Sequence, residues 1–260
     1  MPRRLPRSAP QTWPVLVAGA GIAGLTVALS LHRLGIGVVV AEASRRLRPQ
    51  GAGTLLLPAA IRELEALGLG PAILGGIGMP LRERLHIDAT GFAPAPEALG
   101  RAAGYRWPCM AVHRGLLQQA LWDTLLRRAG PDAILTGRRV TACDLVSDGT
   151  VAVAMTRPDA RADLRSARIL IGADGWLSAV RARMHPQAKA RAQAAAWYGV
   201  ARLRLGAHAA RMVHVDGHAG AATLLPMSPP DSSGASDVAW RVTTPRTDAD
   251  PVPGWFQSVD

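Results

Sequence analysis

Three glycines at fixed spacing between two apolar runs constrain the fold of this chain more than any other feature. They stand in Gly19-Ala20-Gly21-Ile22-Ala23-Gly24. The run before them, residues 14–18, is short, continuous and contains β-branched residues, which is typical of a buried parallel strand. Residues 22–34 have helical composition, and a second apolar run, 36–40, leads to Glu42. This order predicts a strand–helix–strand unit.

The predicted helix has an apolar face that is expected to pack on the strands. Glycines at positions 35 and 37 are expected to end it. The face consists of four residues: Leu25, Ala28, Leu31 and Leu34.

A dinucleotide site gives each glycine a physical role. Gly19 permits a tight turn, Gly21 lets the backbone approach a pyrophosphate without an intervening Cβ atom, and Gly24 lets helix and strand pack closely. The N–H groups of the first helical turn have no intrahelical partner, so together with the helix dipole they attract phosphate. If the glycines served only to pack a helix on a sheet, the acid that follows the second apolar run would have no explanation.

That acid is Glu42, which stands 18 positions after Gly24, followed by Ala43. The distance is close to the offset of about 20 residues at which such sites place a ribose-binding acid. A carboxylate accepts hydrogen bonds from ribose hydroxyls and repels a 2′-phosphate. The sequence therefore predicts a dinucleotide cradle and disfavours NADP as the dinucleotide held in it.

Composition favours a folded enzyme over a nucleic-acid-binding protein. The 260 residues suffice for one large domain or two small ones, and 48% of them are hydrophobic. The net charge is +11, but the arginines are scattered along the chain and form no stripe with interleaved aromatic residues. No nucleic-acid partner is expected. Residues 1–12 are expected to be a basic, flexible tail.

Two alternatives concern the compartment. The uncharged run 15–31 follows an arginine-rich start, so it could be a signal peptide or a membrane span. Its three glycines and the following His32 and Arg33 argue against both, and no stable membrane insertion is expected. Cys109 and Cys143 lack CxxC spacing. We expect two buried free thiols and a cytoplasmic protein.

Three downstream segments distinguish between FAD and NAD as the dinucleotide. Residues 51–69 combine a glycine-rich approach with an amphipathic helix, and residues 112–121 place Arg114 at a helix start. Residues 167–181 read as a buried strand, then Gly172-Ala173-Asp174-Gly175, then a short helix. Asp174 therefore follows the carboxyl end of a strand, where α/β folds place ligand-facing groups.

With these motifs in register over roughly residues 13–245, the chain resembles the flavin-dependent aromatic hydroxylases, the family of p-hydroxybenzoate and salicylate hydroxylases. The resemblance implies that Arg114 contacts FAD and that Asp174 serves both FAD and the docking of reduced nicotinamide. Family members commonly carry Asn after the proline that matches Pro58, whereas Ala59 stands here. No role is inferred for that position.

The candidate cofactor-binding residues combine the glycine motif, the ribose acid and the residues that carry the resemblance. No catalytic residue is assigned, because the flavin supplies the redox chemistry and no protein nucleophile is expected. No Ser/His/Asp or Cys/His set is identifiable. The candidates are Gly19, Ala20, Gly21, Ile22, Ala23, Gly24, Glu42, Ala43, Arg114, Asp174 and Gly175.

The remaining segments read as strands. Between residues 133 and 172 they are joined by turns, with Asp148-Gly149 as a hairpin. After residue 181, alternating apolar and polar residues predict an antiparallel sheet, which the resemblance makes one wall of a substrate pocket. In this part, Asp216-Gly217 signals a turn flanked by His214 and His218. These are too few ligands at usable spacing, so no metal is expected.

The predicted fold is α/β. It is a three-layer, Rossmann-like FAD-binding domain, split in sequence over 13–75 and 105–182, with part of a mainly antiparallel β substrate domain over 76–104 and 183–260. The resemblance implies an FAD-dependent monooxygenase that uses NAD(P)H and O₂ to hydroxylate an aromatic or polyketide-like substrate. Halogenases and lipid-modifying reductases are alternatives on the same scaffold.

One family motif is missing. Relatives carry a Gly-Asp pair followed by Ala and His and a Pro- and Gly-rich loop beside the flavin ring, and nothing like it occurs before Asp260. We expect a truncated chain, or one that a second chain completes. The alternative function is that of an inactive remnant with adenine-dinucleotide affinity alone.

Overall fold

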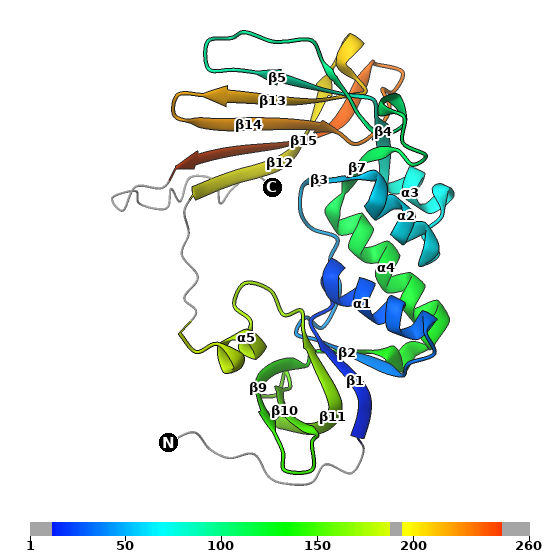
Figure 1. The fold of residues 1–260 in the computed structure, drawn as a ribbon, viewed down its shortest axis with the longest axis vertical. Coiled ribbons are helices and arrows are strands. Elements are labelled where there is room, and N and C mark those ends of the chain that lie inside the picture. The colour runs from blue at the N-terminus through cyan, green and yellow to red at the C-terminus, as the bar shows by residue number, and fades with distance from the viewer. Residues whose placement is uncertain (1–11, 188–193, 246–260) are drawn as a thin grey trace.

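The computed structural model describes residues 12–187 and 194–245. Within these ranges the strands form two six-stranded sheets and one three-stranded sheet (Figure 1). Residues 1–11 of the expected basic tail, and the chain after residue 245, lie outside the described residues.

The first sheet has the strand order β8-β2-β1-β11-β10-β9. β1 pairs in parallel with both β2 and β11, and β2 pairs in parallel with β8, whereas β9, β10 and β11 are antiparallel. The hairpin predicted at Asp148-Gly149 joins β9 to β10. The strands are β1 (Thr12–Ala18), β2 (Val38–Glu42), β8 (Ile134–Thr136), β9 (Arg139–Leu145), β10 (Val151–Thr156) and β11 (Ala162–Gly172).

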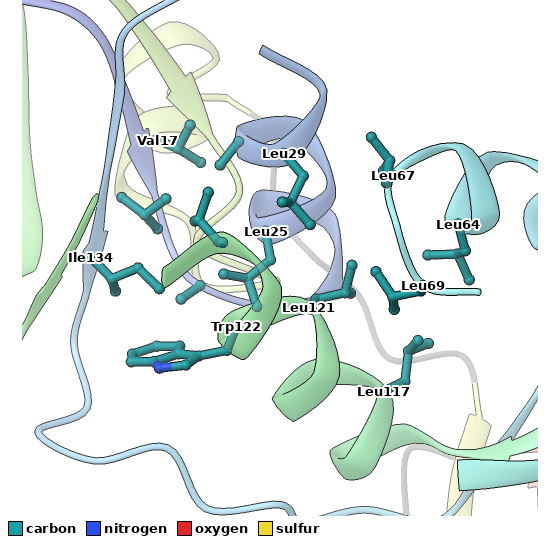
Figure 2. Close-up of a cluster of buried hydrophobic side chains, with 14 of the residues drawn as sticks. Val17, Leu25, Leu29, Leu64, Leu67, Leu69, Leu117, Leu121, Trp122 and Ile134 are labelled. Atoms are coloured by element: carbon teal, nitrogen blue, oxygen red, sulfur yellow. The ribbon is translucent and has the colours of Figure 1, made fainter. Parts of the chain in front are cut away.

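Helices lie on both faces of this sheet. Alternate side chains of β1 are therefore buried on opposite sides. Val15 and Val17 pack with α1 and α4, in the cluster that Figure 2 shows. Leu16 and Ala18 pack with β9, β10 and α5. The result is the predicted three-layer α/β arrangement. The helices are α1 (Ile22–Arg33), α2 (Pro58–Ala66), α3 (Pro71–Ile77), α4 (Arg114–Ala129) and α5 (Ala179–Met184), with 3-10 turns η1 (Gly100–Ala103), η2 (Pro131–Ala133) and η3 (Gly206–His208).

Two details of the prediction for the first sheet and its helix were wrong. Leu34 does not face the core; it is 73% exposed, because the helix ends at Arg33 and Leu34 lies at the C-cap. Leu29 takes the buried position instead. The strand before Asp174 is also not buried throughout, since Ile169 is 55% exposed. This strand borders the antiparallel half of the sheet, where one face is commonly solvated.

The second six-stranded sheet has the order β12-β15-β14-β13-β5-β6 and is antiparallel, except that β13 pairs in parallel with β5. The prediction of a mainly antiparallel sheet is confirmed. Figure 1 shows it at the opposite end of the molecule from β9 and β10. Its strands are β5 (Glu83–Ile87), β6 (Glu97–Ala98), β12 (Ala194–Arg204), β13 (Arg211–Gly217), β14 (Gly220–Pro226) and β15 (Ala235–Pro245).

The small third sheet connects the two large ones. It consists of β3 (Gly53–Leu56), β7 (Cys109–His113) and β4 (Gly78–Leu81), with β7 in the middle. Leu81 and Ala111 of this sheet pack with Met227 and Ala239, at the second large sheet. β3 was not predicted, because the two glycines in residues 51–53 suggest a loop.

The hairpin predicted at Asp216-Gly217 joins β13 to β14. However, His214 does not flank an exposed turn as expected. It lies inside β13, is partly buried, and hydrogen-bonds Thr223 of β14.

The structure also bears on the compartment alternatives. The apolar run 15–31 divides into the end of β1 and most of α1. Within residues 12–187 and 194–245, none of the helices combines the length and hydropathy needed to cross a bilayer. Cys109 and Cys143 are buried free thiols, as expected, and burial raises the pKa of both.

Candidate functional site

The predicted cofactor residues meet at one edge of the first sheet, because its parallel strands end in register. Ala18, the last residue of β1, pairs with Ala41 of β2 and with Gly172 of β11. The glycine motif, Glu42 and the Asp174-Gly175 turn each follow or end one of these strands. Segments that are about 130 residues apart in the chain therefore lie side by side.

The glycines of the motif have different surroundings. Gly19 has φ +99°, and a Cβ atom there would lie 2.5 Å from the carbonyl oxygen of Ala173. A Cβ atom on Gly24 would collide with the carbonyl oxygen of Gly19. At Gly21, by contrast, a Cβ atom would meet no heavy atom within 4 Å beyond its own chain neighbours. The first and third glycines are thus required by packing, whereas the second faces open space.

That open space adjoins the N-terminus of α1. Gly21 is the N-cap residue, no side chain caps the helix, and its first turn carries no acidic residue. The N–H groups of Ile22 and Ala23 therefore have no intrahelical acceptor. The loop before the helix is fixed by Gln118, whose Nε2 donates to the carbonyl oxygen of Ala20 at 2.8 Å. This arrangement fits an anion such as a pyrophosphate.

Two backbone hydrogen bonds hold the Glu42 carboxylate. Oε2 accepts from the N–H of Ala20 at 2.8 Å, and Oε1 accepts from the N–H of Ser44 at 2.7 Å. Each oxygen keeps a second lone pair, so the carboxylate can still accept from two further donors. Glu42 thus links the glycine loop to β2 and presents a fixed acceptor to the cavity beside it.

This cavity has a volume of ≈ 530 Å³ and collects most of the predicted residues. A second cavity of ≈ 700 Å³ shares Glu42 and Gln118 with it and extends along Ser44–Arg48 and Gln50. The first cavity is lined by Ala18, Gly19, Gly21, Ala41, Glu42, Ala43, Gln118, Arg138, Arg139, Val140, Thr141, Ala173, Asp174, Gly175, Leu177 and Ala179.

Asp174 also has a structural function that the sequence analysis did not assign. Its Oδ1 accepts from the hydroxyl of Ser178 at 2.5 Å, and its Oδ2 accepts from the N–H of Ala179 at 2.7 Å. Ser178 in turn accepts from the N–H of Arg181 at 2.9 Å. Asp174 and Ser178 together cap α5, which fixes the turn beside the cavity.

Arg114 does not line the same cavity as the glycine motif. It is the first residue of α4 and lines a further cavity of ≈ 550 Å³ between β3 and the second large sheet. Gln118, one helical turn later, lines the two cavities near Glu42. Sequence reasoning missed Gln118, although its i, i+4 spacing from Arg114 places both on one helix face. The start of α4 thus connects the cavities.

Comparisons with known proteins agree with this geometry. The family described as "FAD binding domain" matches residues 12–253. The chain is 44% identical over 174 residues to phenazine 1,6-dicarboxylic acid hydroxylase PhzS of Lysobacter antibioticus, which covers 66% of the chain and 42% of that protein. It is 36% identical over 172 residues to the FAD-dependent urate hydroxylase of Klebsiella pneumoniae, covering 64% and 41%.

Among solved structures, HpxO of Klebsiella pneumoniae complexed with FAD and uric acid matches with a TM-score of 0.67 and 27% identity. The match covers 92% of this chain and 58% of that one. For the two curated relatives, PhzS and the urate hydroxylase, the chain spans less than half of their length.

Proposed function

This chain belongs to the FAD binding domain family, and from that premise we propose that it is part of an FAD-dependent monooxygenase. The proposed reaction hydroxylates an aromatic or polyketide-like substrate with NAD(P)H and O₂. The observation that carries the proposal is the open space at Gly21, beside an uncapped helix N-terminus and a fixed carboxylate. Since the chain spans 42% and 41% of its curated relatives, the whole protein's activity and substrate are part of the proposal.

The residues fit the ADP half of FAD. Residues 19–24 would hold the pyrophosphate, and Glu42 with Ala43 would bind the ribose of the adenosine. Asp174-Gly175 lines the same cavity, and Arg114 would contact the flavin half. Bound FAD supplies the redox chemistry that activates O₂; the chain's own residues bind and orient the cofactor and exclude water around it.

The cavity beside Arg114 is the proposed substrate pocket. Its volume of ≈ 550 Å³ lies in the range of small-molecule sites. Apolar side chains such as Leu55 and Leu225 line it, with Tyr198 and Arg241 as polar groups. That composition suits a flat ring with an acidic or hydroxyl substituent. The substrates in the relatives' names, a phenazine acid and urate, are of this kind.

The division of the chain follows from these roles. We propose residues 13–75 and 105–182 as the FAD-binding domain and residues 76–104 and 183–260 as part of a substrate domain. The remaining wall around the flavin ring would come from protein outside the described residues, on this polypeptide or on a second chain. The two buried free thiols support a cytoplasmic location.

The test is the amount of hydroxylated product formed per NAD(P)H consumed. The protein is supplied with FAD and either a phenazine carboxylic acid or urate, and Gly21→Val serves as the matched control. We expect flavin binding and substrate-dependent NAD(P)H oxidation that the variant lacks. Flavin binding without hydroxylation of any aromatic substrate would instead support a binding remnant. Absence of adenine-nucleotide binding at millimolar concentration would overturn both functions.

A further inference from the structure

A cluster of two histidines and an aspartate lies on the second large sheet and contains none of the candidate cofactor residues. β5 and β13 are parallel neighbours, and His86 is directly paired with His214. Asp216 follows two residues later on β13, so it points to the same face. Because His86 is 128 residues before His214, local sequence spacing could not reveal this grouping.

The three side chains converge on one point. Nε2 of His86 lies 2.7 Å from Oδ2 of Asp216, and Nε2 of His214 lies 3.2 Å from Oδ1. The two imidazole rings meet edge to face with their centroids 5.3 Å apart. One nitrogen or oxygen from each residue lies within 4.8 Å of the other two. The side chains are 50%, 30% and 47% exposed, so the cluster is open to solvent.

We propose that His86, His214 and Asp216 bind one divalent transition-metal ion of the zinc class. The ligands would be Nε2 of each histidine and one carboxylate oxygen, with the fourth position open to water. Ligands about 2.0–2.1 Å from a tetrahedral zinc lie roughly 3.3 Å from one another. The two Nε2 atoms lie 2.7 and 3.2 Å from the two different oxygens of Asp216, so the three side chains already have a comparable spacing. Two imidazoles and a carboxylate suit zinc better than calcium or magnesium, which prefer oxygen ligands alone.

Hydrogen bonding around the cluster supports metal binding. Nδ1 of His214 lies 2.9 Å from the hydroxyl oxygen of Thr223. With a metal on Nε2, Nδ1 carries the proton and donates it to this oxygen, which fixes the tautomer and the ring orientation.

Two arginines close to the cluster are already ion-paired. Arg84, two residues before His86, forms an ion pair with Glu97, and Arg211 pairs with Glu83 at 2.5 Å. A bound ion would connect two strands that are far apart in sequence and would stabilise the folded chain by mass action. The inference does not rest on the proposed oxygenase function, although Thr223, the partner of His214, also lines the cavity proposed as the substrate pocket.

Zinc titration of the full chain by calorimetry tests the site, with the thermal unfolding midpoint as a second readout. We expect one zinc ion per chain and a rise in the midpoint. His86→Gln should lower zinc affinity roughly tenfold or more and remove the rise. The matched control is His218→Gln in the β13–β14 turn, which should bind zinc like the unmodified chain.

Thr223→Val separates ordered coordination from weak surface adsorption. It removes no ligand but removes the hydrogen-bond partner of His214, so zinc affinity should fall several-fold. Equal zinc affinity in the unmodified chain and in the folded His86→Gln variant would overturn the proposal. So would no binding at millimolar zinc, which would leave the cluster as a hydrogen-bonded network only.

Discussion

At the scale of single residues, the three glycines of the cradle differ in what a side chain would meet. Gly21 has φ −68° and ψ 175°, which any residue adopts, and its Cβ position is open. We predict that Gly21→Val leaves the free energy of unfolding nearly unchanged but abolishes FAD and ADP binding, because its methyl groups occupy the pyrophosphate space. Calorimetric titration and urea unfolding measure the two effects.

Gly24→Ala is the contrasting variant. Its Cβ would collide with the carbonyl oxygen of Gly19, so this change should destabilise the fold by about 1–3 kcal/mol. If Gly21→Val bound FAD normally, the cradle assignment would be wrong.

Glu42 combines a structural and a proposed binding role. We predict that Glu42→Gln weakens ADP binding by about 1–3 kcal/mol, since a charged acceptor for ribose is lost. The amide NH₂ would also face the N–H of Ala20 or of Ser44, so the unfolding midpoint should fall. Glu63→Gln, on the exposed side of α2, is the control and should change neither. An unchanged dissociation constant for ADP would remove Glu42 from the site.

Single residues also show where sequence reasoning reaches its limit. Glu42 could be predicted because its spacing from the glycines follows from the geometry of one strand–helix–strand unit. Gln118 and His86 act through contacts with segments 98 and 130 residues away, as the bonds to Ala20 and Asp216 show. Such contacts depend on tertiary structure, and no local pattern encodes them.

At the scale of elements, α5 depends on the turn that precedes it. Asp174 and Ser178 share its N-terminal cap. We predict that Ser178→Ala destabilises the protein by about 1 kcal/mol with little effect on FAD affinity, the usual cost of a lost cap. Asp174→Ala should cause a similar loss of stability and also weaken FAD binding, because Asp174 lines the cavity. Chemical unfolding and FAD titration of both variants separate the two roles; equal FAD affinity would restrict Asp174 to capping.

The elements that the sequence predicted are those with local signals. The helix from Ile22, the helix from Arg114 and the two Asp-Gly hairpins each have a glycine, a cap or an alternating pattern at the right position. β3 lacks such a signal because residues 51–53, which lead into it, contain two glycines and suggest a loop. The parallel pairing of β5 with β13 could not be predicted either, since the pairing residues are separated by more than 120 positions.

At the scale of the whole molecule, the first turns of α4 line three cavities, two beside Glu42 and one against the second large sheet. Gln118 lines the cavities beside Glu42, and Arg114 lines the cavity against the second large sheet. We proposed that one FAD molecule extends from the cavities beside Glu42 toward the cavity beside Arg114. This proposal assigns different parts of FAD to Gln118 and Arg114. The ADP half should depend on Gln118, whereas the flavin half should depend on Arg114.

The resulting prediction compares ligands as well as variants. Arg114→Ala should weaken FAD binding roughly tenfold or more, because a charged hydrogen-bonding group contributes about 1.5–3 kcal/mol. ADP would not reach the cavity that Arg114 lines, so its affinity should stay within about twofold of that of the unmodified chain. Arg128→Ala, at the far end of α4, is the control. Calorimetric titration with both ligands measures the difference. A parallel loss of ADP and FAD affinity in Arg114→Ala would show that Arg114 supports the cradle itself, and the proposed path of FAD between the cavities would then be wrong.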